Sequence, residues 1–65
     1  MYKRLYIELK ARKITHAEVA KALGITAQAF SYKVNGKSDF TAPEMFEIKK
    51  IIKDVPMEQL FKKDN

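Results

Sequence analysis

The feature that most constrains the fold of this chain is a pair of short helical patterns separated by a single glycine. They lie within residues 14–37, ITHAEVAKALGITAQAFSYKVNGK. In the first pattern Thr15 precedes Glu18 by three residues, which is the capping box that satisfies free amide groups at a helix start. Gly24 follows, where a helix commonly ends in a left-handed conformation. Thr26 is placed to cap the second helix. The pattern therefore predicts two consecutive helices joined by a tight turn.

Residues 2–12 carry a further helical pattern. Leu5 and Leu9 share a stripe with either Tyr2 or Tyr6, at steps of three and four residues. Such a stripe is the face of a helix that turns toward a core.

The second half of the chain repeats the helical signals. TAPE at residues 41–44 is a second capping box with Pro43 in the first turn, where a missing N–H costs nothing. The expected buried stripe of this fourth helix is Met45, Ile48, Ile51 and Ile52. A short fifth helix is expected from Pro56, with Leu60 and Phe61 as apolar anchors. With no repeat and no linker, residues 1–65 are predicted to form one all-α domain, a compact five-helix bundle.

Composition excludes several classes of function. At 65 residues the chain has little material for a catalytic cleft, because a domain of this size buries only about 60% of its unfolded surface. It has no Cys and one His, so we expect no disulfide, no metal site, no cofactor and no catalytic residues. No apolar run could span a membrane and no signal peptide is present, which predicts a cytoplasmic protein. The net charge of +5 favours a polyanionic partner.

The expected third helix, from Thr26 to about Val34, has an unusual outer face. Phe30 and Val34 point within about 40° of each other and form a core pair. On the other side Gln28 and Tyr32 lie within about 40° of each other. A solvated helix face usually carries Lys and Glu, whereas an amide and a phenol among small residues can hydrogen-bond base edges in a major groove. The alternative is that these are merely exposed polar residues.

This arrangement resembles the Cro/CI-type (XRE-like) helix-turn-helix family of phage and bacterial transcriptional regulators, whose fold is lambda-repressor-like. The helix-turn-helix would span about residues 15–35. The resemblance rests on an apolar residue before Thr15, small Ala20 at the helix crossing, Gly24 in the turn, and Asn35-Gly36-Lys37 after the second helix. It extends to DFTAPEMFEIKKII and VPMEQLF, which are similar to the family's fourth and fifth helices.

The resemblance implies roles for single residues. The positions expected to face base edges are Ala27, Gln28 and Tyr32. The positions expected at the DNA backbone or flanking it are His16, Thr26, Ser31, Lys33, Asn35 and Lys37. Asn35 and Gly36 are also expected to tolerate the positive φ of a helix end. Lys33 and Val34 depart from the family's usual apolar-then-acidic pair, and Ala27 is short, with a thymine methyl as its base contact.

These observations predict a sequence-specific, double-stranded-DNA-binding transcriptional regulator. A Cro-like repressor acting by operator occupancy is expected from the resemblance and from the length of the chain. One small domain reads few base pairs, so we expect a pseudo-palindromic operator and a homodimer, formed in solution or only on DNA. The alternative is that the fold serves as a protein-interaction module, an antitoxin-like or co-repressor-like partner. An enzyme is disfavoured because no nucleophile–base arrangement is present.

Overall fold

The structure, a computed structural model that describes residues 1–63, has five helices and no strand in that range. They are α1 (Lys3–Ala11), α2 (His16–Leu23), α3 (Ala27–Val34), α4 (Ala42–Ile51) and α5 (Met57–Leu60). The predicted all-α class is confirmed, and its helix bounds are met to within about two residues. Of the predicted domain 1–65, the last two residues lie outside the described range. No helix within residues 1–63 is long and apolar enough to cross a membrane.

Three helices have a threonine as their N-cap residue, as the sequence predicts. The Oγ1 atoms of Thr15, Thr26 and Thr41 accept hydrogen bonds from the backbone N–H three residues later, at 3.1, 3.1 and 3.3 Å. At α2 and α4 the reciprocal bond from a glutamate completes the capping box. These caps stabilise short helices that would not form alone, because each satisfies an amide that the helix leaves unpaired.

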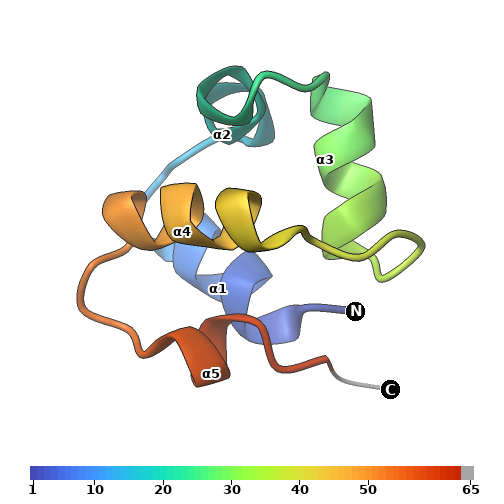
Figure 1. Ribbon diagram of the computed structural model, residues 1–65. Helices are drawn as coiled ribbons and strands as arrows, with labels where there is room; N and C mark the ends of the chain where they lie inside the picture. Colours follow the sequence, from blue (N-terminus) through green and yellow to red (C-terminus); the bar gives the residue numbers. More distant parts are fainter. Residues whose placement is uncertain (64–65) are drawn as a thin grey trace.

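The helices surround one core rather than lying in layers. Figure 1 shows α4 passing in front of α1, with α2 above, α3 to one side and α5 below. The extents of the molecule are nearly equal, at 24 × 23 × 22 Å. The buried apolar residues come from all five helices and the segments between them: Tyr2, Leu5, Leu9, Val19, Ala20, Phe30, Val34, Phe40, Ile48, Ile52, Val55 and Leu60.

Helix α3 turns toward the core the face that the sequence predicts. Phe30 and Val34 are both buried, as the sequence predicts. Gly36 has a positive φ of 84°, as expected of the residue after a helix end. The same expectation for Asn35 was wrong, since its φ is −76° and it continues the right-handed turn. Only one left-handed residue is needed to close this helix end.

One ion pair and one hydrogen bond join Arg12 and Arg4 to the C-terminal third of the chain. The Glu8 carboxylate lies 2.7 Å from Arg4 Nε and 3.1 Å from Arg12 Nη2. Hydrogen bonds from Arg4 and Arg12 lower the pKa of Glu8. Arg12 also reaches Asp54 at 2.8 Å, and Arg4 reaches Gln59 at 3.2 Å. The guanidinium groups of α1 are thereby engaged by the segments around α5.

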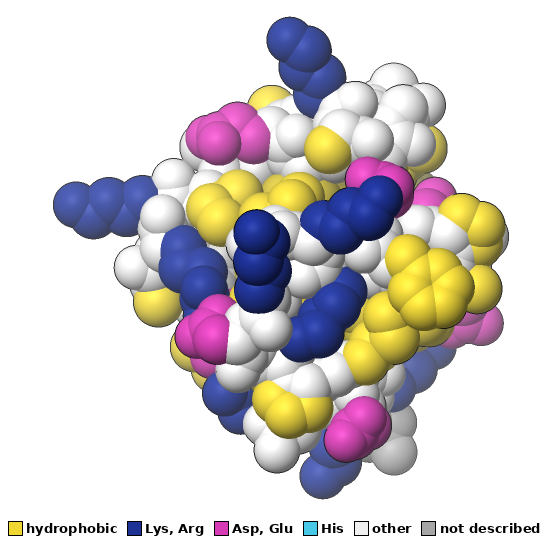
Figure 2. Space-filling model, turned by 60° about the vertical axis from the view of Figure 1, so that its left-hand side comes forward, with side chains coloured by type: hydrophobic (Ala, Val, Ile, Leu, Met, Phe, Trp, Pro, Cys, Tyr) yellow, Lys and Arg dark blue, Asp and Glu magenta, His cyan; other side chains and the backbone are white. Residues whose placement is uncertain are grey.

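The surface mixes charge with exposed apolar groups. On the face in Figure 2, Lys and Arg side chains stand beside acidic ones and beside hydrophobic side chains. Lys50, for example, pairs with Glu47 at 3.0 Å. Phe46, on α4, is 59% exposed and is the most exposed large apolar side chain of residues 1–63.

The two glycines allow a matched stability test. Gly24 has a φ of 74° and an added Cβ would meet no atom within 4 Å, so Gly24→Ala carries only the cost of a left-handed residue, about 1 kcal/mol. At Gly36 an added Cβ would also lie 2.9 Å from the Met1 backbone nitrogen. We therefore expect Gly36→Ala to lower the free energy of unfolding by roughly 2 kcal/mol, measured by urea titration. Equal losses for the two variants would contradict the close approach at Gly36.

Candidate functional site

The site predicted from the sequence lies on α3 and the segments that hold it. Helix α3 packs on α2, where Ala20 is small and buried and lets the two helices approach. The turn between them is closed by Gly24 at φ 74° and by a 3.0 Å bond from Ile25 N to Ala20 O. Helix α3 is therefore held by its inner face and leaves its outer face uncovered within residues 1–63.

The residues expected at base edges share that outer face. Ala27 and Gln28 are exposed, and Tyr32 is 48% exposed. The Lys37 ammonium lies 5.2 Å from the centre of the Tyr32 ring, a cation–π distance. The face thus combines a small residue at its start, an amide, a phenol and an adjacent positive charge.

The end of α3 places Asn35 and Lys37 beside this face. Lys37 N donates to Tyr32 O and Gly36 N donates to Lys33 O, both at 3.0 Å, which is the hydrogen-bond pair of a Schellman motif. The side chains of Asn35 and Lys37 are exposed. No ion pair in the described chain engages Lys37. Both residues are free to meet a ligand that lies along α3.

His16 and Ser31, expected to touch a DNA backbone, contact each other. His16 Nδ1 and Ser31 Oγ share a hydrogen bond of 2.9 Å between α2 and α3. The imidazole packs edge-on against Phe30 at 5.1 Å and Tyr6 at 6.2 Å between ring centroids. Sequence reasoning missed this pairing, because the two residues are fifteen positions apart. It orients α3 on α2 at the edge of the exposed face.

Lys33, expected near a phosphate, is engaged inside the chain. Its ammonium lies 3.1 Å from the Glu44 carboxylate and donates to Asp39 O at 3.0 Å. The Lys33 side chain is only 16% exposed. Burial raises the pKa of Glu44, but hydrogen bonds from the Thr41 backbone and from Lys33 outweigh it and lower that pKa overall. Lys33 thus ties α3 to the start of α4.

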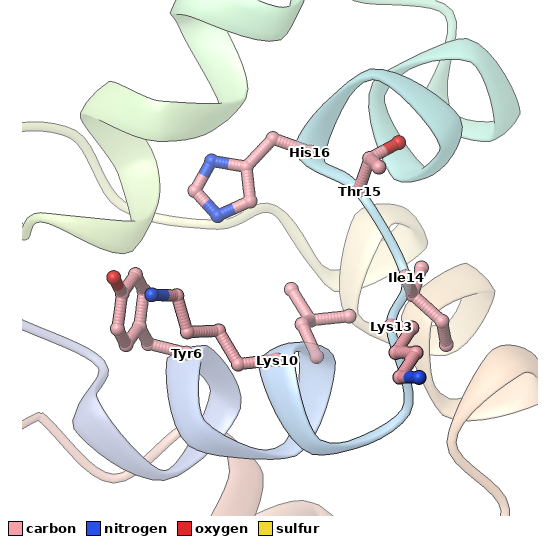
Figure 3. Close-up of a pocket in the computed structure, with 7 residues that line it drawn as sticks. Tyr6, Lys10, Lys13, Ile14, Thr15 and His16 are labelled. Atoms are coloured by element: carbon pink, nitrogen blue, oxygen red, sulfur yellow. The ribbon is translucent and has the colours of Figure 1, made fainter.

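A hollow of about 490 Å³ opens between α1 and the start of α2. Figure 3 shows Tyr6 and Lys10 at one side of it, Lys13 at the other and the His16 ring above. Leu9, Ile14 and Thr15 complete the lining. In residues 1–63 no three His, Cys, Asp or Glu side chains are grouped as metal ligands would be. The lining thus combines the apolar side chains of Leu9 and Ile14 with two lysines.

Comparison of the chain with protein-family models, with curated proteins and with solved structures found no match.

The His16–Ser31 bond can be measured directly. We expect a double-mutant cycle with His16→Phe and Ser31→Ala to give a coupling of about 1 kcal/mol in the free energy of unfolding, as for one hydrogen bond that is partly buried. Phenylalanine keeps the edge contacts with Phe30 and Tyr6, so the cycle isolates the polar contact. A coupling near zero would mean that the bond does not hold α3 on α2.

Proposed function

We propose that this chain is a sequence-specific, double-stranded-DNA-binding transcriptional regulator. In this proposal α2 and α3 form a helix-turn-helix, and α3 enters the major groove. The observation that carries it is the outer face of α3, where Ala27, Gln28 and Tyr32 are exposed while Phe30 and Val34, behind them, are buried.

The side chains on this face match the chemistry of base edges. Gln28 can donate and accept at the same time, as adenine requires in the major groove. The Tyr32 hydroxyl can do either, and Ala27 can contact a thymine methyl. Eight residues make α3 about 12 Å long, and the small residue at its start lets it sit deep in a groove about 12 Å wide.

Contacts to the DNA backbone would come from the rim of the same face. Thr26 caps α3, and its hydroxyl hydrogen remains available for a phosphate after Oγ1 has accepted the Ala29 amide. Asn35 and Lys37 are exposed at the other end of α3. His16 and Ser31 flank the face as a bonded pair. Lys33 is left out of this proposal, because its ammonium is already held by the Glu44 carboxylate at 3.1 Å.

The mode of action we propose is operator occupancy, as in a Cro-like repressor. A good bidentate base contact contributes roughly 1–3 kcal/mol of discrimination, so one short helix selects few base pairs. Two copies on a pseudo-palindromic site, with their recognition helices about 34 Å apart, would supply the remaining specificity. The homodimer would form through the protein's own surface or only on DNA.

The test is a selection from genomic DNA fragments at about 50 and 200 mM salt, with wild type and Gln28→Ala/Tyr32→Ala. We expect wild type to enrich a palindromic site and to lose affinity with salt, at a log–log slope near −0.9 per phosphate contacted. The double variant should keep weak binding and lose the sequence preference.

Phe46→Ala/Gln59→Ala is the matched control, because it removes an exposed aromatic ring and an amide from α4 and α5 without changing charge. It should select the same site as wild type. If wild type enriches no sequence, or if the α3 variant selects as wild type does, base reading by this face is wrong. Retention of a protein partner without DNA selectivity would favour the protein-interaction alternative.

A further inference from the structure

Three helices of this protein end in the same motif, but one end has an unexpected residue. After α2 and α3 the left-handed position holds Gly24 and Gly36, which are the only glycines in the sequence. After α1 the corresponding position holds Lys13, at φ 57°. The hydrogen bonds are equivalent, since Ile14 N donates to Leu9 O at 2.9 Å and Lys13 N donates to Lys10 O at 3.1 Å.

A lysine is a poor choice for this conformation. The left-handed region brings Cβ of an L residue close to the following carbonyl oxygen, and glycine avoids that contact. Lys13 is the only residue other than glycine with a positive φ in residues 1–63. Strained residues of this kind concentrate at functional positions. We therefore expect the Lys13 side chain to make a functional contact whose benefit exceeds the conformational cost of the left-handed backbone.

Lys13 stands at the edge of the hollow between α1 and α2, together with Lys10. Figure 3 shows the two side chains on opposite sides of the hollow, with the His16 ring above them. The apolar side chains of Leu9 and Ile14 also line the hollow. An apolar lining with an ammonium group on either side suits a sugar–phosphate backbone, because the sugar can pack on Leu9 and Ile14 while phosphates contact the lysines.

These two ammonium groups are free of acidic partners in the described part of the chain. The nearby arginines, Arg4 in α1 and Arg12 directly after it, are paired with Glu8. Neither Lys10 nor Lys13 occurs in an ion pair. Lys10 lies 5.3 Å from the centre of the Tyr6 ring, which holds its side chain along the hollow.

The hollow adjoins the face proposed to read bases. His16 lines the hollow and shares its hydrogen bond with Ser31 of α3. A DNA strand lying along α3 could therefore continue past His16 to the two lysines.

We propose that Lys10 and Lys13 bind phosphates of the DNA backbone beside the site read by α3, and that position 13 retains a lysine in a left-handed conformation for this contact. The proposal rests on the proposed function and adds two backbone-binding residues that the sequence did not indicate.

The test uses Lys13→Gly, Lys10→Ala and the double variant, with DNA binding to the selected site measured from about 50 to 200 mM salt. Each single variant should reduce the steepness of the log–log salt dependence by about 0.9, and the double variant by about 1.8. All three should keep the sequence preference of wild type, because phosphate contacts carry no base information. Lys13→Gly should at the same time raise the Tm, by roughly 4 °C.

Lys50→Ala is the control, since it removes one positive charge from α4 and should leave the salt dependence within error of wild type. The proposal is overturned if wild type selects its site and the double variant has an unchanged salt slope, and the proposed function then survives. It is equally overturned if Lys13→Gly does not raise the Tm. If wild type selects no DNA at all, the proposed function and this inference fail together.

Discussion

The burial of Phe40 is the constraint on which the rest of the structure depends. This ring lies in the segment between α3 and α4 and packs against Tyr2, Phe30 and Phe61, at 5.1, 5.8 and 5.5 Å between centroids. The contacts join the N-terminal end of the chain, α3 and the residue after α5. A chain of 65 residues buries little surface, so aromatic rings that bring distant segments together supply much of what fixes its shape.

The packing of α3 against the core determines which of its side chains are exposed. Phe30 anchors the helix in the core, and the Lys33–Glu44 pair fixes it on α4. Other acidic groups also form ion pairs within the protein: Asp39 pairs with Lys63, and Glu8 pairs with Arg12. Unpaired lysines remain beside α3 and the α1–α2 hollow. The proposals draw on this arrangement, since Lys37 beside α3 and Lys10 and Lys13 at the hollow form no ion pair within residues 1–63.

The sequence was sufficient for local structure and insufficient for side-chain pairing. Capping threonines and the periodic apolar stripe act within a few residues, so the bounds of the helices and the inward side of α3 could be predicted. The Lys33–Glu44 and His16–Ser31 pairs join separate helices, and their geometry depends on packing that no local pattern encodes. The left-handed Lys13 could not be anticipated either, because propensity places glycine or asparagine there. The expectation for Asn35 failed because Gly36 alone supplies the left-handed residue that closes α3.

The central claim, that the outer face of α3 binds duplex DNA, is tested most directly by backbone-amide NMR of the free protein titrated with its selected duplex. We expect the largest chemical-shift changes on α3 from Ala27 to Tyr32, on the start of α2 near His16 and on the segment at Lys37. Amides of α4 and α5 around Phe46 and Gln59 should shift little. Changes centred on Phe46, with the amides of α3 unshifted, would contradict the claim and place the binding surface on α4.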